Sequence, residues 1–196
     1  MVSGMKILAV YGSPRRLGNT SLLLKKAVDG AREAGAELEE VVLRDLRMAP
    51  CLEIYGCKKT GRCVIQDDFQ RVYDQLLECH GLMLASPIFF YAVSAHTKIL
   101  MDRCQSLWVK KYWIEKVLFG QGEIKRKGLF ISAGATSGKK LFDGALLSVR
   151  YFFDVLNMEV WRTLLYRGLD HEADVLEHPQ YLAEAYQAGR ELAVSC

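Results

Sequence analysis

The stretch Lys6-Ile7-Leu8-Ala9-Val10-Tyr11-Gly12-Ser13-Pro14-Arg15-Arg16-Leu17-Gly18-Asn19-Thr20-Ser21 decides the fold of this chain. Its first six residues form a short apolar run that ends at a glycine, which predicts a buried strand. From Ser21 onward the spacing of apolar residues becomes helical, at Leu22, Leu23, Ala27, Ala31 and Ala34. The turn between strand and helix would aim backbone N–H groups, hydroxyls and the positive helix end at one point. This arrangement predicts a phosphate-binding turn.

A plain helix cap is the alternative explanation for this turn, because any strand-to-helix turn favours Ser, Thr or Asn as a cap and Gly for its geometry. One cap accounts for Asn19 or Thr20, but not for the hydroxyls of Ser13, Thr20 and Ser21 together with two arginines. The spacing matches neither the P-loop, which needs Gly-Lys-Ser/Thr, nor the dinucleotide G-x-G-x-x-G fingerprint. We therefore expect a phosphate that belongs to neither ATP nor a Rossmann-bound NAD.

Length and composition are those of a soluble protein with one well-cored domain. The chain has 196 residues, of which 51% are hydrophobic and 25% charged, and a net charge of +3. This charge is too small to indicate a nucleic-acid partner, and no apolar stretch is long enough for a membrane span. We expect one domain over residues 1–196, with residues 1–4 as a ragged leader, and a cytoplasmic location. The basic triplet 125–127 is interpreted as a solvated entrance to a strand.

Five expected strands alternate with helices along the chain. The strands span residues 6–11, 37–43, 81–86, 128–132 and 158–166, the third stopping at Pro87, whereas the aromatic segment 105–126 fits no element. This alternation predicts an α/β fold with a doubly wound five-stranded parallel sheet of order 2-1-3-4-5 and helices on both faces. Ligands bind such sheets beyond the carboxyl ends of the strands. There the turns 12–21, 86–94 and 133–138 would lie side by side.

Three segments carry a family resemblance: Gly12-Ser13-Pro14-Arg15 through Gly18-Asn19-Thr20, then Ser86-Pro87-Ile88-Phe89-Phe90, then Lys98 through Met101-Asp102-Arg103. In order and over nearly the whole chain, they resemble the NADPH-dependent FMN reductase-like flavoproteins, which have a flavodoxin-like fold. The branch that is most similar comprises the iron–sulfur flavoproteins and their cluster-free relatives. The resemblance implies FMN as the cofactor and NAD(P)H as a transient co-substrate.

The same resemblance implies which residues contact the FMN. Its phosphate would be held by Ser13, Arg15, Gly18, Asn19, Thr20 and Ser21. Its isoalloxazine ring would be bordered by Pro87, Ile88, Phe89, Phe90 and Val93, and on the other edge by Ala133, Gly134 and Thr136. An apolar wall with backbone amides is how a protein seats a flavin and tunes its potential. Asp102 and Arg103, late in a helix, are expected to form a structural ion pair.

The loop from residue 44 to residue 66 contains an incomplete cysteine motif. The iron–sulfur branch carries Cys-x2-Cys-x2-Cys and a fourth Cys four to seven residues later. Here Cys51, Cys57 and Cys63 match the first, third and fourth positions, and Ile54 occupies the second. A cubane cluster takes four thiolates, so we expect no cluster, and these three cysteines as its ligands if one exists. Free thiols, a redox pair and a partial metal site completed by Glu53 or water remain the alternatives.

The resemblance implies an FMN-dependent oxidoreductase that takes hydride from NAD(P)H and passes electrons to flavin, a quinone or another acceptor. The flavin carries this chemistry, so no catalytic side chain is required. The alternatives are a non-enzymatic FMN electron carrier, an iron–sulfur flavoprotein with an unusual cluster, and a regulatory protein without flavin. Electron carriers of the flavodoxin kind are usually strongly acidic, unlike this chain. The acceptor would be a small molecule or a protein.

We expect a homodimer or homotetramer. The aromatic segment around Trp108 and Trp113 would suit an interface and, from a second subunit, would bound the nicotinamide site. A lid on the chain's own core is the alternative role for this segment.

Overall fold

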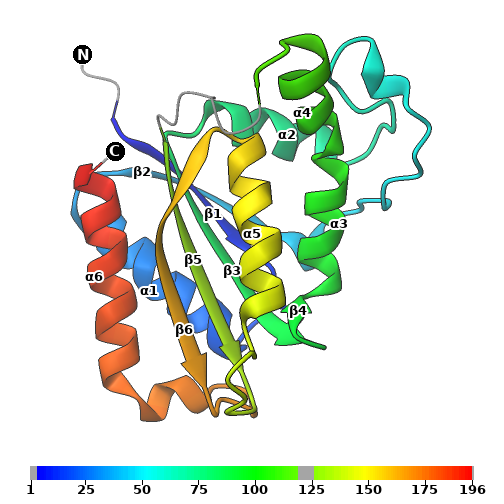
Figure 1. Ribbon diagram of the computed structural model, residues 1–196. Helices are drawn as coiled ribbons and strands as arrows, with labels where there is room; N and C mark the ends of the chain where they lie inside the picture. The colour runs from blue at the N-terminus through cyan, green and yellow to red at the C-terminus, as the bar shows by residue number, and fades with distance from the viewer. Residues whose placement is uncertain (1–3, 119–125, 196) are drawn as a thin grey trace.

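Five parallel strands form the centre of the computed structural model, which describes residues 4–118 and 126–195 (Figure 1). They are β1 (Lys6–Tyr11), β2 (Glu37–Val42), β3 (Gly81–Phe89), β5 (Arg126–Gly134) and β6 (Met158–Arg167). Their order is β2-β1-β3-β5-β6, and every neighbouring pair in it is parallel. Counting parallel strands alone, this is the expected order 2-1-3-4-5, so the flavodoxin-like fold is confirmed.

The third strand continues past Pro87 instead of stopping there. It runs to Phe89 and turns back into a sixth strand, β4 (Ala92–Val93), which pairs antiparallel with β3. Because β1 pairs with β3 only as far as Ala85, Pro87 faces one neighbouring strand instead of two. Sheets tolerate proline at such edges, and this is why the strand does not end at Pro87.

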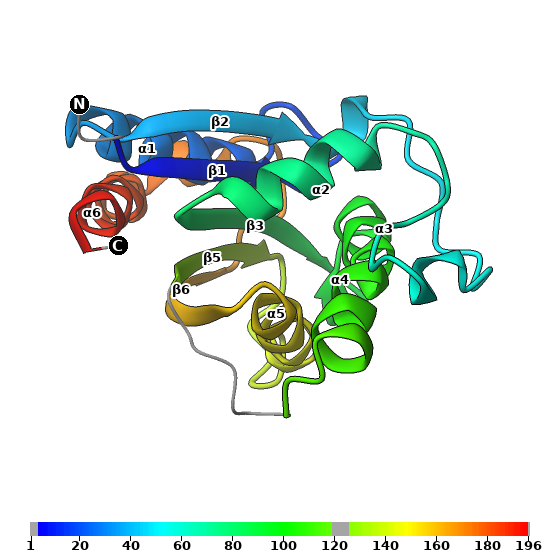
Figure 2. The same cartoon turned by 90° about the horizontal axis from the view of Figure 1, so that it is seen from above.

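Helices cover both faces of the sheet (Figure 2). One face carries α1 (Asn19–Glu33) and α6 (Pro179–Ser195), and the other carries α2 (Phe69–Glu78), α3 (Ala95–Arg103), α4 (Gln105–Val109) and α5 (Asp143–Val155). Two apolar clusters result, one containing Ile7 and Ala9 and the other Leu8 and Val10, because successive strand residues point to opposite faces. Burial on both faces explains why β1 is apolar from Ile7 onward.

Shorter helical turns complete the described chain. They are η1 (Leu43–Asp45), η2 (Gly56–Lys58), η4 (Asp174–Glu177) and a π-helical turn η3 (Lys110–Ile114) that continues α4. The first half of the aromatic segment is therefore helical, while residues 119–125, residues 1–3 of the expected leader and Cys196 lie outside the described residues. None of the helices in the described ranges is long and apolar enough to cross a membrane.

For Arg126, the interpretation of the basic triplet 125–127 as a solvated entrance to a strand is wrong. Its guanidinium donates hydrogen bonds to the carbonyls of Leu76 and Cys79 at the end of α2, and to that of Leu156 after α5. The last carbonyls of a helix lack partners within the helix. Arg126 thus satisfies the ends of two helices and fixes the start of β5 between them.

Candidate functional site

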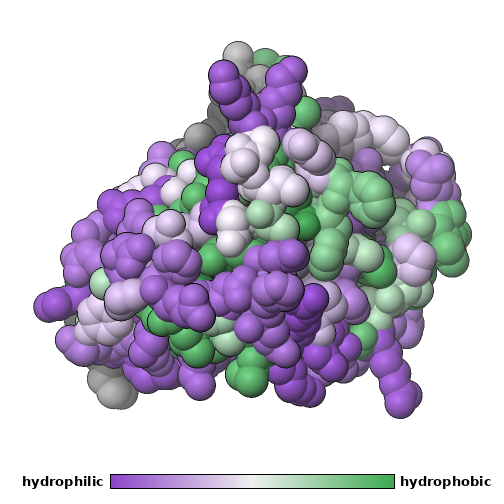
Figure 3. All heavy atoms as spheres, turned by 90° about the horizontal axis from the view of Figure 1, so that it is seen from below, coloured by the Kyte–Doolittle hydropathy of each residue, from purple (hydrophilic) through white to green (hydrophobic). Residues whose placement is uncertain are grey.

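A cleft of about 120 Å³ opens at the carboxyl ends of β1, β3 and β5. Ten of the fourteen residues assigned to the cofactor line it: Ser13, Arg15, Gly18, Asn19, Thr20, Pro87, Ile88, Phe89, Ala133 and Gly134. The cleft is completed by Pro14, Ala135, Leu169 and Asp170, which were not among the residues assigned to the cofactor. Seen from this side of the molecule, hydrophobic surface interrupts a largely hydrophilic face (Figure 3). The three turns expected to meet therefore do so.

The start of α1 forms the polar side of the cleft. Gly18 occupies the cap position, no side chain caps the helix, and its first turn contains no acidic residue. The hydroxyl of Thr20 is buried and has no hydrogen-bond partner among the described residues. Burying an unpaired hydroxyl costs about 1–3 kcal/mol, and a helix N-terminus favours negative charge. This side of the cleft therefore fits an anion such as a phosphate.

Local contacts set the shape of the turn before α1. The Ser13 hydroxyl accepts a hydrogen bond from the Arg15 backbone N–H, and the Ser21 hydroxyl donates one to the Arg15 carbonyl, each at 3.1 Å. A Cβ on Gly18 would lie 2.6 Å from the Ser13 hydroxyl, so a side chain there would displace this hydroxyl from its place in the turn. Ser21 is buried and does not line the cleft. Its hydroxyl therefore stabilises the turn through the Arg15 carbonyl without facing the cleft.

Asn19 and Arg15 tie this turn to the loop that follows β6. The amide of Asn19 donates to the His171 carbonyl at 2.9 Å and accepts from the Val175 N–H at 3.0 Å. The guanidinium of Arg15 donates to the Asp170 carbonyl at 3.3 Å. The nitrogen and the oxygen of the Asn19 amide thus both form hydrogen bonds within the protein. The sequence does not indicate this loop, because the loop makes these contacts through backbone groups, which leave no residue-type signal.

The ends of β3 and β5 form the apolar side of the cleft. Pro87 pairs with Ala133 across the two strands. A Cβ on Gly134 would lie 3.4 Å from the Cβ of Ile88 and 3.0 Å from Leu141, so the glycine permits close packing here. An apolar wall opposite a few polar groups is the usual construction of a cofactor site.

Three expected ring contacts lie outside the cleft. Val93 is buried in the apolar cluster beneath α2 to α5, and Thr136 is exposed. Phe90 is fully exposed at the tip of the β3–β4 hairpin. For all fourteen residues, inside the cleft or outside it, contact with a cofactor stays a prediction. Trp108 and Trp113 also lie away from the cleft, where they line a second cavity.

The three cysteines of the incomplete motif line this second cavity, which has a volume of about 180 Å³. Burial raises the pKa of Cys57, and the charges of Cys63 and Cys51 add to this effect. Ile54, in contrast, is 60% exposed and does not line the cavity. Within residues 4–118 and 126–195, no group of three or more metal-ligating side chains is arranged to hold an ion.

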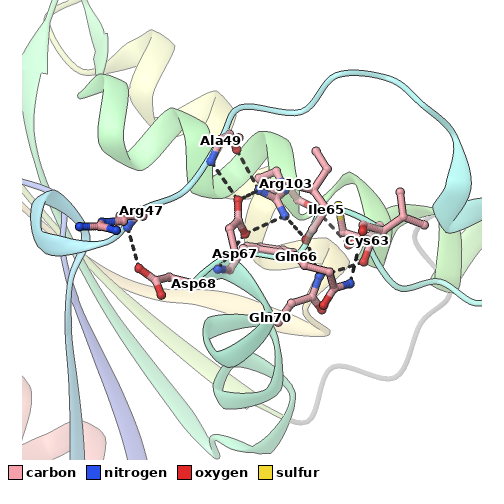
Figure 4. Close-up of polar contacts among 12 residues, drawn as sticks. Arg47, Ala49, Cys63, Ile65, Gln66, Asp67, Asp68, Gln70 and Arg103 are labelled. Atoms are coloured by element: carbon pink, nitrogen blue, oxygen red, sulfur yellow. Dashed lines mark hydrogen bonds and ion pairs between the residues drawn. The ribbon is translucent and has the colours of Figure 1, made fainter.

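Arg103 connects the two ends of the cysteine loop. The prediction that it pairs with Asp102 is wrong. Its guanidinium donates to Asp67 at 2.5 and 3.0 Å and to the carbonyls of Ala49 and Ile65 (Figure 4). Asp102 pairs instead with Lys98 at 2.6 Å. Side chains four residues apart on a helix lie on one face, whereas adjacent ones do not.

Comparisons with known proteins agree with this fold. A model of the NADPH-dependent FMN reductase family matches residues 5–165. An iron–sulfur flavoprotein of Methanocaldococcus jannaschii is 41% identical over 103 residues, which cover 53% of this chain and 53% of that one. A second iron–sulfur flavoprotein of that organism is 31% identical over 157 residues, covering 79% of this chain and 73% of the relative.

The first of these matches spans only about half the length of the relative. Among solved structures, an NAD(P)H:quinone oxidoreductase from Methanothermobacter marburgensis has a TM-score of 0.70 at 17% identity, covering 97% of this chain and 96% of that one, and this likeness supports the fold alone. Because the family model matches most of its length, the chain belongs to the NADPH-dependent FMN reductase family.

Proposed function

We propose that this chain is an FMN-dependent oxidoreductase that accepts hydride from NAD(P)H and passes electrons to a second acceptor. The observation that carries the proposal is the buried, unpaired Thr20 hydroxyl at the uncapped start of α1. A phosphate oxygen would accept a hydrogen bond from this hydroxyl. FMN has one such phosphate and a flat, largely apolar ring, and the cleft offers a polar and an apolar side for these two parts.

The residues of the cleft would bind and orient this cofactor. The Thr20 hydroxyl and the first backbone amides of α1 would hold the phosphate, and Arg15 would supply positive charge beside it. Pro87 and Ile88 would support the ring and keep water from that side, while Gly134 leaves room for its close approach. When bound, the flavin supplies the acceptance of hydride and the release of electrons.

The FMN-loaded chain is expected to oxidise NAD(P)H continuously when free flavin or a quinone is supplied. The loss of NAD(P)H absorbance measures this turnover, with the same concentration of free FMN as the control. Negligible turnover by a chain that retains FMN would contradict the proposal and favour an electron carrier. A chain that takes up no added FMN would contradict the cofactor assignment itself.

We also propose the kind of acceptor and the oligomeric state. The acceptor is a small molecule or a redox protein, and the protein acts as a homodimer or homotetramer. The exposed side chains of Phe90 and Trp113 would suit such an interface. A cytoplasmic setting agrees with the five free cysteines among the described residues, because reducing compartments keep thiols free.

The names of the relatives imply an iron–sulfur cluster, but the residues of this chain do not fit one. A cubane cluster takes four thiolates, and the second cavity offers those of Cys51, Cys57 and Cys63. The remaining position of the motif is Ile54, whose side chain has no ligating atom. We therefore propose that the chain carries no cluster.

Replacing Ile54 by cysteine is expected to enable cluster uptake, because the variant has the complete four-cysteine spacing of the iron–sulfur branch. Residue 54 is exposed outside the cavity, so uptake requires it to turn toward Cys51, Cys57 and Cys63. After anaerobic reconstitution with iron and sulfide, the variant should bind about four irons per chain, the content of a cubane cluster. The wild type and the matched Ile54→Ser control should bind neither iron nor sulfide in stoichiometric amounts. Stoichiometric iron and sulfide in the wild type would overturn the assignment.

A further inference from the structure

The cysteine cavity is separate from the cleft, since no residue lines both. Its walls combine the three partly buried thiols with the aromatic side chains of Tyr55, Trp108 and Trp113. Because the cysteines are only partly buried, a small molecule that enters the cavity can reach their sulfur atoms. The proposed oxidoreductase function assigns no role to this cavity.

The loop geometry brings the chain segments around Cys57 and Cys63 together. The Gly61 N–H donates to the Cys57 carbonyl at 2.7 Å, which closes a tight turn between the two cysteines. Next to this turn, a Cβ on Gly56 would lie only 2.4 Å from Val64, so the chain segments before Cys57 and after Cys63 are in direct contact.

Arg103 places a positive charge beside Cys63. Its side chain is fully buried and lines the cavity, and its Nε has no hydrogen-bond partner among the described residues. Burial lowers the pKa of Arg103, but Asp67 and Cys63 more than offset this and raise it. In Figure 4, Cys63 lies beside the network in which Arg103 holds both ends of the loop. A guanidinium in this position stabilises negative charge that develops on the Cys63 sulfur.

We propose that Cys57 and Cys63 form a redox-active dithiol that exchanges with small-molecule disulfides, RS–SR, in this cavity. First, the Cys63 sulfur attacks one sulfur of RS–SR. The RS–SR bond breaks, a mixed disulfide forms, and one RSH leaves with the Cys63 proton. Next, the Cys57 sulfur attacks the Cys63 sulfur, and a second RSH leaves with the Cys57 proton. Two electrons pass from the protein dithiol to the small disulfide, which is reduced to two thiols.

Oxidised glutathione is the probe that tests this proposal. The reduced, FMN-loaded chain is treated with a chelator, incubated anaerobically with oxidised glutathione, alkylated and analysed by mass spectrometry. We expect the loss of two hydrogens and, after trypsin, two peptides joined through Cys57 and Cys63, because Lys58, Lys59 and Arg62 lie between them. Excess reduced glutathione should reverse the reaction.

Serine variants distinguish the role of Cys63, which attacks the small disulfide, from that of Cys57, which resolves the mixed disulfide. Cys57→Ser should accumulate a glutathione adduct on Cys63, and Cys63→Ser should yield neither adduct nor disulfide. Cys51→Ser is the matched control and should form the Cys57–Cys63 disulfide at the wild-type rate. Unchanged FMN content shows that each variant is folded, since the cleft shares no residue with the cavity.

Three results would overturn the dithiol. They are the absence of any Cys57–Cys63 disulfide, an equal loss of the reaction in Cys51→Ser, and stoichiometric iron and sulfide in the purified wild type. None of them bears on NAD(P)H oxidation, so failure of the dithiol is distinguishable from failure of the oxidoreductase function.

Discussion

Replacing Arg15 and Thr20 together by alanine is expected to weaken FMN binding by roughly 2–4 kcal/mol, a factor of about 30 to 1,000 in Kd. Arg15 lines the cleft with its positive charge, and the Thr20 hydroxyl is buried there without a partner. Each would contact a charged phosphate, and hydrogen bonds to charged groups contribute about 1.5–3 kcal/mol. Titration of the apoprotein with FMN, followed by flavin fluorescence, measures the change.

Arg16→Ala is the matched control for this double variant. Arg16 belongs to the same turn, but it pairs with Asp45 at 3.0 Å and does not line the cleft. Its removal should leave the Kd for FMN nearly unchanged. A double variant that binds FMN as tightly as the wild type would refute the phosphate assignment. An equal loss of FMN affinity in Arg16→Ala would mean that the effect comes from the general positive charge of the turn and not from specific phosphate contacts.

The parallel sheet could be predicted because burial on both faces leaves continuous apolar runs such as 6–11 and 81–86. The β3–β4 hairpin could not, since Phe90 and Tyr91 occupy its turn with φ of +50° and +61°. Residues with positive φ in such turns are usually Asn or Gly, so two aromatic residues give no hairpin signal. Packing determines the conformation of this turn. A Cβ on Gly144 would lie 2.6 Å from the Tyr91 carbonyl, so the lack of a side chain on Gly144 leaves room for the turn.

The position of the candidate site could also be predicted, but the role of each side chain depends on its neighbours. Hydroxyl and glycine residues after the first strand indicated the turn correctly. The amide of Asn19, however, bonds to a loop about 150 residues later, at His171 and Val175. Residue types and spacing carry no information about such a partner. Arg103 is the clearest case, because its partner Asp67 lies 36 positions earlier in the chain.

Asp67→Asn is expected to lower the free energy of unfolding by about 3–5 kcal/mol, the usual cost of removing one partner of a buried ion pair. The variant leaves the fully buried Arg103 guanidinium without its carboxylate. It also weakens an acceptor of two backbone hydrogen bonds, from Ala49 at 2.9 Å and Phe69 at 3.1 Å. Because Arg103 holds both ends of the cysteine loop, this loop should open first. Denaturant unfolding measures the loss.

Asp68→Asn is the matched control, because Asp68 is exposed and accepts a single backbone hydrogen bond, from Arg47. Its effect should stay within about 1 kcal/mol. Exchanging both partners, in Asp67→Asn with Arg103→Met, should recover part of the loss, since no buried charge then remains. A single variant as stable as the wild type would show that the pair contributes little to the fold.

The pH dependence of stability provides an independent check of the same pair. Burial raises the pKa of Asp67. Arg103 and the two backbone amides lower it by more than burial raises it, so the pKa lies below its ordinary value of 3.8. A carboxyl group with a depressed pKa stabilises the fold above its unfolded pKa, and this contribution is lost as the pH falls through the folded pKa. The stability difference between the wild type and Asp67→Asn should therefore be largest at neutral pH and shrink in acid. A difference that is constant with pH would mean that the variant acts through lost packing and not through the charge of Asp67.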